Sequence, residues 1–172
     1  MVRLSSLWHW CAALLFFGQS AFAQTAPAHP DEQIFTDWRV LCQSAEETTT
    51  CQMLQSASAS EDGPAVFLLS ISPGEDAGAN YAVVTVPTGV YLAPGIEIRV
   101  DRRRPFKVLY EICDRAGCHA GFKLSGSVLS AFRNGLDAKV RVWTAKTQAV
   151  EFPVSLRGFS AAYRHYQEQV SG

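Results

Sequence analysis

The chain has 172 residues, of which 48% are hydrophobic and 18% charged, and its formal net charge is −1. This composition is typical of one globular domain of ordinary size and excludes intrinsic disorder. The near balance of charge excludes the strongly basic surface of a dedicated nucleic-acid binder.

The first 23 residues have the three parts of a secretory signal peptide. Arg3 supplies a short positive region, residues 7–17 form an apolar run, and Ala21-Phe22-Ala23 forms a small-x-small cleavage site. The apolar run is shorter than the ~20 residues that a membrane-spanning helix needs. We therefore expect cleavage after Ala23 and an exported protein, periplasmic or secreted, with no transmembrane segment in the mature chain.

After the signal peptide we expect a flexible lead-in over residues 24–35 and a single domain over residues 36–172. The lead-in begins with small, polar and proline residues. Within the domain the dominant hydrophobic period is two, the period of a half-buried strand. This period covers residues 38–42, 96–100, 106–112 and 140–142, and more continuous apolar runs, which we expect to lie deeper, cover residues 64–72, 81–86 and 149–155.

Short turns separate these runs and set the fold class. Glycine and proline turn sequences recur at residues 62–64, 72–74, 87–89 and 93–95. Many short strands joined by such turns predict an all-β fold, a sandwich or a barrel. Residues 127–134 and 159–169 instead have helical spacing and predict two short helices, with Ser125 or Ser127 as the N-cap of the first.

Four cysteines follow the signal peptide, and an even number in an exported protein predicts two disulfides. Proximity in sequence favours Cys42 with Cys51 and Cys113 with Cys118. The alternative is a redox-active pair formed by Cys113 and Cys118, because a strained small disulfide loop is more easily reduced.

The sequence carries no recognisable catalytic or metal-binding motif. It lacks a nucleophile elbow, a phosphate-binding glycine loop and any histidine pair at metal-binding spacing. His119 follows Cys118, but the spacing of Cys113 and Cys118 is not that of a haem-attachment motif, and a zinc site would need thiolates that an oxidising compartment disfavours. We therefore predict no cofactor, no metal site and no enzymatic activity.

Charge is unevenly distributed along the chain. Residues 24–96 carry nine acidic residues and one base, a net charge of −8, and residues 97–172 carry thirteen bases and seven acids, a net charge of +6. Because the halves of a sandwich interleave in space, this asymmetry need not reach the surface. Arg102, Arg103 and Arg104, here called the arginine turn, lie between two alternating runs and are predicted at a hairpin tip. Such a tip could contact an anionic partner, such as lipid headgroups, lipopolysaccharide or a sulfated glycan.

Five ordered blocks resemble one known family. The blocks are Asp37-Trp38-x-Val40-x-Cys42, Cys51-Gln52-Met53, Pro87-x-Gly89-Val90-x-Leu92-x-Pro94-Gly95, Cys113-Asp114-x-x-Gly117-Cys118 and Val154-Ser155-Leu156-x-Gly158-Phe159. Over residues 36–163 the chain resembles the invasion-associated locus B family of exported bacterial proteins.

This resemblance implies an immunoglobulin-like antiparallel β-sandwich in the envelope of a Gram-negative bacterium, and a virulence-associated role in contact with host cells. It implies no catalytic mechanism and no binding residues. We expect a non-enzymatic protein that binds a protein or an anionic partner at the envelope or the host surface. The alternatives are a periplasmic redox module using Cys113 and Cys118, and an accessory subunit of a membrane complex.

Overall fold

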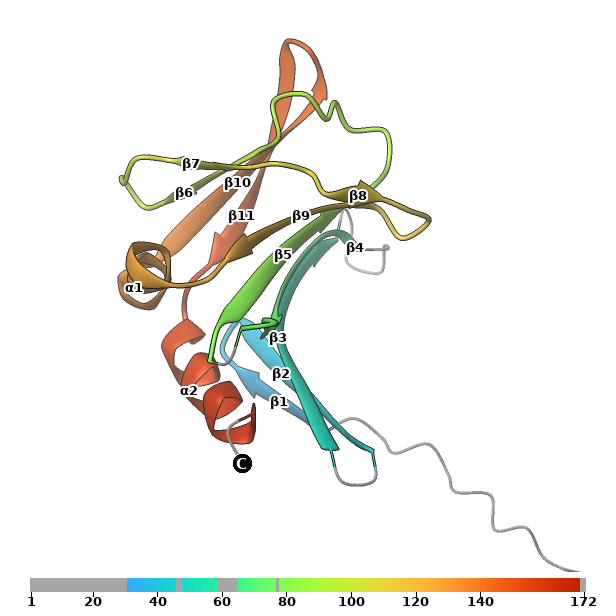
Figure 1. The fold of residues 1–172 in the computed structure, drawn as a ribbon. Coiled ribbons are helices and arrows are strands. Elements are labelled where there is room, and N and C mark those ends of the chain that lie inside the picture. Colours follow the sequence, from blue (N-terminus) through green and yellow to red (C-terminus); the bar gives the residue numbers. More distant parts are fainter. Residues whose placement is uncertain (1–30, 46–47, 59–64, 77, 171–172) are drawn as a thin grey trace, which may run out of the picture.

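The computed structural model describes residues 31–45, 48–58, 65–76 and 78–170 (Figure 1). The predicted signal peptide and its cleavage site at Ala23 lie outside the described residues, as do residues 24–30 of the predicted lead-in. The strands are β1 (Asp31–Phe35), β2 (Trp38–Ala45), β3 (Thr48–Ser58), β4 (Ala65–Pro73), β5 (Asn80–Val86), β6 (Ile96–Val100), β7 (Phe106–Val108), β8 (Ile112–Cys113), β9 (Cys118–Lys123), β10 (Asp137–Ala145) and β11 (Gln148–Ser155). The helices are α1 (Gly126–Asn134) and α2 (Phe159–Val170).

These strands form two antiparallel sheets. The larger sheet has seven strands in the order β1-β2-β3-β4-β5-β9-β8, and the smaller has four in the order β11-β10-β6-β7. The first five strands pair in sequence order, which makes them an antiparallel meander. The prediction of an all-β antiparallel sandwich with two short helices is confirmed.

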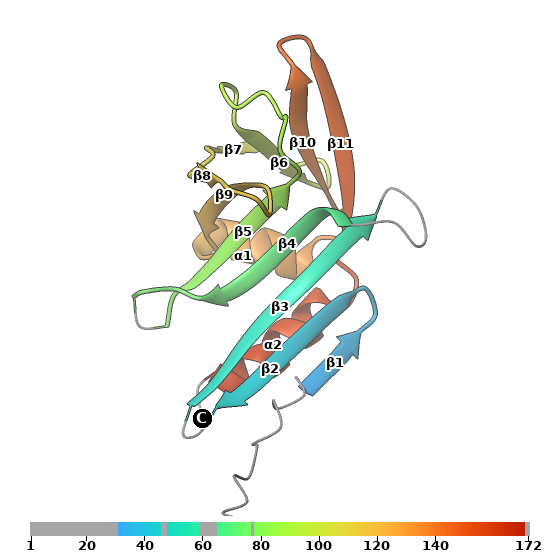
Figure 2. The same ribbon diagram turned by 90° about the vertical axis from the view of Figure 1, so that its right-hand side faces the viewer.

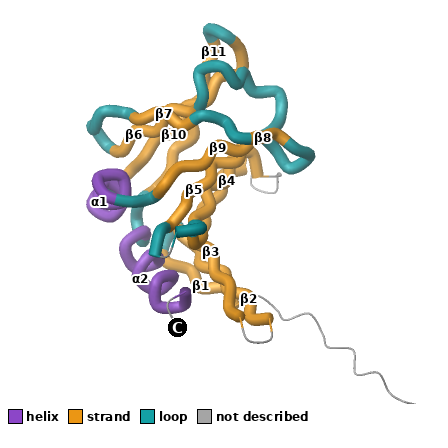
Figure 3. Tube along the Cα trace, viewed as in Figure 1, coloured by secondary structure: helices purple, strands orange, loops and turns teal. Residues whose placement is uncertain are grey.

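The core lies between the sheets and continues beneath α2. The inward residues of β5 and β6 alternate strictly with half-buried ones, as the period-two pattern predicts. The smaller sheet meets β2 and β3 only through the end of β11, and over most of β1, β2 and β3 the second layer is α2 (Figure 2). Figure 3 shows both helices along one side of the molecule. The inward face of α2 carries Phe159, Ala162, Tyr163 and Tyr166, the face that helical spacing predicts.

The turn that leads into α2 depends on a glycine. Gly158 has a φ of +84°, and a Cβ at this position would overlap the carbonyl oxygen of Phe35. Only glycine has both the required left-handed backbone and the missing side chain. The close approach places Phe159 against Trp38, with ring centroids 5.1 Å apart in an edge-to-face arrangement.

Three local predictions were wrong. Residues 106–112 do not form one strand: β7 belongs to the smaller sheet and β8 to the larger, because the chain crosses between the sheets over residues 109–111. The run at residues 149–155 is not deep, since β11 is an edge strand exposed over most of its length. Residues 31–35, assigned to the lead-in, form β1 and pair with β2.

Tyr110 lies at this crossing, and its hydroxyl is buried without a hydrogen-bond partner among the described residues. An unsatisfied buried hydroxyl costs about 1–3 kcal/mol. We therefore expect Tyr110→Phe to raise the free energy of unfolding by about 1 kcal/mol at neutral pH, as measured by urea denaturation.

The same variant should change the alkaline pH dependence. Burial raises the pKa of Tyr110 to about 12 from an ordinary value of 10.0. The stability that follows from keeping this phenol neutral is present below pH 10 and is lost as the pH rises towards about 12. The advantage of Tyr110→Phe should therefore widen over that interval. A variant less stable than the wild type at neutral pH would contradict this account of Tyr110.

Candidate functional site: the arginine turn and its surroundings

The arginine turn connects β6 to β7, and all three of its side chains are exposed. The backbone of the turn is fixed by Asp101, whose φ is +47°. Its Oδ1 accepts hydrogen bonds from the backbone N–H groups of Leu136 at 3.2 Å and Asp137 at 3.1 Å, and its own N–H donates to the carbonyl of Asp137 at 2.8 Å. The turn is therefore held against the connection between α1 and β10.

A hollow of about 790 Å³ lies beside this turn, and its lining residues are Arg99, Asp101, Arg102, Arg103, Leu136, Asp137 and Lys139. Within the described residues, Arg99, Arg102 and Arg103 have no ion-pair partner, whereas one oxygen of Asp101 is occupied by backbone donors. The hollow thus has an excess of positive charge with guanidinium groups free to bind an anion.

Sequence reasoning located the arginine turn but missed Arg99 and Lys139. These two residues lie at directly paired positions of β6 and β10, 40 positions apart in the chain. The strand pattern indicated that both point away from the core, but only the register brings them together.

The charge asymmetry of the chain is also an asymmetry of the fold. Strands β1 to β5 come from the acidic half and all belong to the larger sheet, whereas all four strands of the smaller sheet begin at or after Ile96. Strands β8 and β9 of the larger sheet come from the basic half, but most basic residues lie on the smaller sheet, its turns and the helices.

The structure contains both predicted disulfides, with the connectivity that proximity favours. Cys42 is bonded to Cys51, and Cys113 to Cys118, each pair at directly opposed positions of neighbouring strands. Two disulfides fit an exported protein. In this second bridge Cys113 is an exposed residue and Cys118 is a buried one.

The hairpin closed by Cys113 and Cys118 also contains an Asp–His–Thr chain of hydrogen bonds. Asp114 Oδ1 lies 3.1 Å from His119 Nε2, and His119 Nδ1 lies 2.9 Å from the Thr85 hydroxyl. Asp114 Oδ1 also accepts from the backbone N–H groups of Ala116 and Gly117. The hydrogen bonds from His119 and from these N–H groups lower the pKa of the Asp114 carboxyl.

This arrangement fixes a turn, because one carboxylate oxygen receives the donors of three residues of the same hairpin. No group of three or more metal-ligating side chains is found in the described parts of the chain. The redox function of Cys113 and Cys118 remains a prediction.

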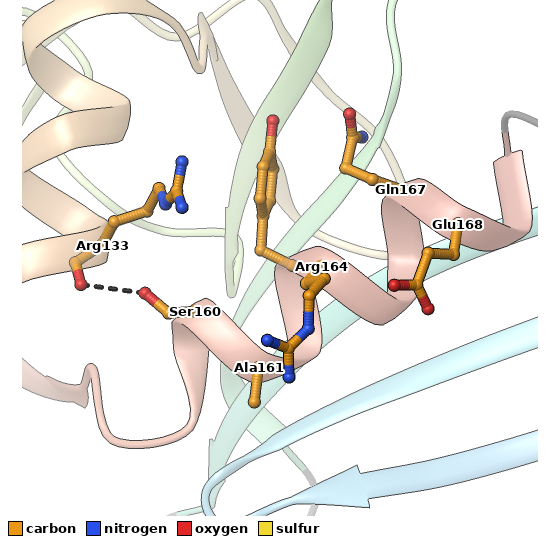
Figure 4. Close-up of a pocket in the computed structure, with 7 residues that line it drawn as sticks. Arg133, Ser160, Ala161, Arg164, Gln167 and Glu168 are labelled. Carbon is orange, nitrogen blue, oxygen red and sulfur yellow. Dashed lines mark hydrogen bonds between the residues drawn. The ribbon is translucent and has the colours of Figure 1, made fainter.

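A second hollow, of about 730 Å³, lies along α2 (Figure 4). Arg133 from the end of α1 and Arg164 from α2 flank it, and Gln167 and Glu168 continue its wall. The Ser160 hydroxyl donates to the Arg133 carbonyl at 2.9 Å and ties the two helices together. Two arginines without ion-pair partners in the described residues make this hollow basic as well, although no pattern in the sequence groups them.

Comparison with known proteins identifies the family. The profile described as Invasion associated locus B (IalB) protein matches residues 38–167. The chain belongs to the IalB family.

Similar proteins agree with this membership. IalB-family relatives from Brucella abortus strains 2308 and 9-941, each described as an invasion protein B homolog, are 30% identical over 154 residues, which covers 86% of this chain and 87% of theirs. The crystal structure of invasion associated protein B from Bartonella henselae superposes with a TM-score of 0.69 at 21% identity, covering 80% of this chain and 95% of that one. The latter likeness concerns the fold.

Neither α1 nor α2 is long and apolar enough to span a membrane, and the described residues contain no other helix.

Proposed function

We propose that this protein is an exported, non-enzymatic binding protein of the cell envelope or the host-cell surface, and that the arginine turn contacts an anionic partner. Export would follow from the signal peptide over residues 1–23, with cleavage after Ala23. The relatives described as invasion protein B homologs support a role in contact with host cells.

One observation carries the proposal: the hollow beside the arginine turn. Its unpaired guanidinium groups come from Arg99 at the end of β6 and from two residues of a turn whose backbone is fixed by Asp101. Arginine is the side chain best suited to phosphate, sulfate and carboxylate groups, because its planar fork can bind two oxygens at once.

Charge reversal tests this proposal. We expect the triple variant Arg102→Glu, Arg103→Glu and Arg104→Glu to bind isolated bacterial envelopes or host cells at least about tenfold more weakly than the wild type. Binding of the wild type should also weaken with added salt, because exposed charges are screened. The measurement is a sedimentation assay with purified protein over a range of salt concentrations.

The matched control reverses three other exposed cations, Arg115→Glu, Lys146→Glu and Arg164→Glu. It changes the net charge by the same amount at sites away from the arginine turn. Equal loss in both triple variants would show that net charge alone matters, and unchanged binding in the first variant would remove the arginine turn from the site.

A further inference from the structure

The four-stranded sheet has an outer face whose side chains point away from the core, and the strand register arranges them in rows across the sheet. Two of these rows are fully defined by the register: Glu151, Arg141, Glu97 and Lys107 form one, and Pro153, Lys139 and Arg99 form the next. Beyond the first of them lies a third row, with Trp143 and Leu109. These residues are called here the outer face.

One end of the outer face is apolar. Continuing the β10–β6 register by two residues brings Trp143 opposite Gly95, which directly precedes β6. A Cβ at Gly95 would meet Leu109 Cδ2 at 3.4 Å, so the leucine side chain lies over the glycine backbone. The N–H of Tyr91 donates to the Trp143 carbonyl at 2.7 Å and fixes the adjoining loop. Trp143 is half-buried and Leu109 is 70% exposed.

The middle row is rich in ion pairs, one of which joins Glu151 to Lys139 of the next row at 3.5 Å. Arg141 binds Glu151 at 2.6 Å and Glu97 at 3.6 Å. Lys107, on β7, lies opposite Glu97 of β6. With two acids and two bases, this row is close to neutral and separates the apolar end from the other end.

The far end is basic. Lys139 and Arg99 lie opposite each other, and the chain runs from Arg99 directly into the hollow and the arginine turn. At ~3.3 Å per strand residue, Lys139 lies ~13 Å from Trp143 along β10. The outer face therefore changes from apolar, through neutral, to an end where four bases outnumber Asp101 and Asp137.

We propose that the outer face binds an extended anionic polysaccharide, with a sugar ring packed on Trp143 and Leu109 and with sulfate or carboxylate groups bound by Arg99, Arg102 and Arg103. The apolar side of a pyranose ring packs well on an indole, and guanidinium groups bind oxyanions in pairs of hydrogen bonds. This inference deepens the proposed function and rests on it, because it names the chemical class of the anionic partner and adds the apolar contact.

The layout favours a saccharide chain over a lipid bilayer. Membrane-bound surfaces place apolar side chains deeper than the cations that meet the headgroups. Here the apolar row and the cations lie on the same face of one sheet, separated along β10 by the middle row. A linear chain lying along the strands contacts both, whereas a bilayer parallel to this face would bring the cations to the depth of the apolar row.

Direct binding to defined polysaccharides tests the proposal. The probes are heparin, which is sulfated and carboxylated, dextran sulfate, which is only sulfated, polygalacturonate, which is only carboxylated, and uncharged dextran. We expect the full-length mature protein to bind at least one anionic probe and not dextran.

The double variant Arg99→Ala and Arg103→Ala should raise the Kd about tenfold and make it less dependent on salt. Leu109→Ala should raise the Kd about threefold and leave the salt dependence unchanged.

Two matched controls isolate the face. Arg133→Ala with Arg164→Ala removes the same charge from the hollow along α2, and Ile34→Ala trims an apolar residue of β1 that is 69% exposed. Neither should change the Kd. Equal losses in the test and control variants would overturn the proposal, because the outer face would then have no special role.

The remaining outcomes separate this proposal from the proposed function. Binding of the wild type to phosphatidylglycerol vesicles but to none of the polysaccharides would overturn the saccharide and make a lipid surface the partner. If the wild type bound no probe, while the arginine-turn variant still lost binding to envelopes or cells, the saccharide would be refuted and the proposed function would stand.

Discussion

Trp38→Ala should lower the free energy of unfolding by about 4 kcal/mol, near the upper end of the range for large-to-small core substitutions. Trp38 is fully buried, and its indole N–H donates to the carbonyl of Ser155 at 2.9 Å. Its ring also meets the edge of Phe159. One side chain therefore joins β2 to the end of β11 and to the start of α2, and its loss leaves a cavity at the point where three elements meet.

The measurement is urea denaturation followed by circular dichroism. Trp143→Ala is the matched control, because it makes the same chemical change on the outer face, where the side chain is half-buried. The control should cost less than half as much as Trp38→Ala. Similar losses at the two positions would contradict the central role assigned to Trp38.

Asn80→Ala should cost about 3 kcal/mol, because buried polar groups that lose their partners are expensive. Asn80 begins β5 and is 5% exposed. Its Nδ2 donates to the Tyr163 hydroxyl at 2.7 Å, and its Oδ1 accepts from Tyr166 at 3.1 Å and from Gln167 at 3.2 Å. Burial raises the pKa of both tyrosines above the ordinary value of 10.0, so both hydroxyls keep their protons where an exposed tyrosine would begin to ionise.

A combined variant separates the lost hydrogen bonds from other effects. Removing both hydroxyls in the Asn80→Ala background, with Tyr163→Phe and Tyr166→Phe, deletes the groups that the single substitution leaves unpaired. The triple variant should therefore be more stable than Asn80→Ala alone. If the two further substitutions only add to the damage in denaturant unfolding, the hydrogen-bond explanation for Asn80 is wrong.

The strands were largely predictable because alternation follows directly from which side chains are buried. Ile96, Ile98 and Val100 alternate with charged residues in the sequence and line the core in the structure. The arginine turn was predictable for the same reason, since patterned runs flank it on both sides. The local hydrophobic pattern therefore predicts both the strands and the turn between them.

The assignment of strands to sheets was not predictable in this way. The pattern at residues 106–112 is continuous, yet Val108 and Ile112 belong to different sheets, because nothing local marks the place where the chain crosses over. The edge position of β11 and the pairing of Lys139 with Arg99 depend on register between distant segments. Sequence reasoning missed part of the candidate site for that reason. The alternating pattern placed Arg99 and Lys139 on strands, but it did not show that the two residues are paired.

The position of α2 sets the order in which the fold can be completed. When the chain emerges from its N-terminal end, β1, β2 and β3 appear early, but the helix that covers their apolar face is the last described element. Until α2 docks, Trp38 and Met53 lie on an uncovered sheet. The closing contacts span more than 100 residues, as the contact between Trp38 and Phe159 illustrates. Such non-local closure is slow compared with local pairing. A chain whose closing contacts form last therefore stays incompletely folded for longer, with the apolar face of its first strands exposed.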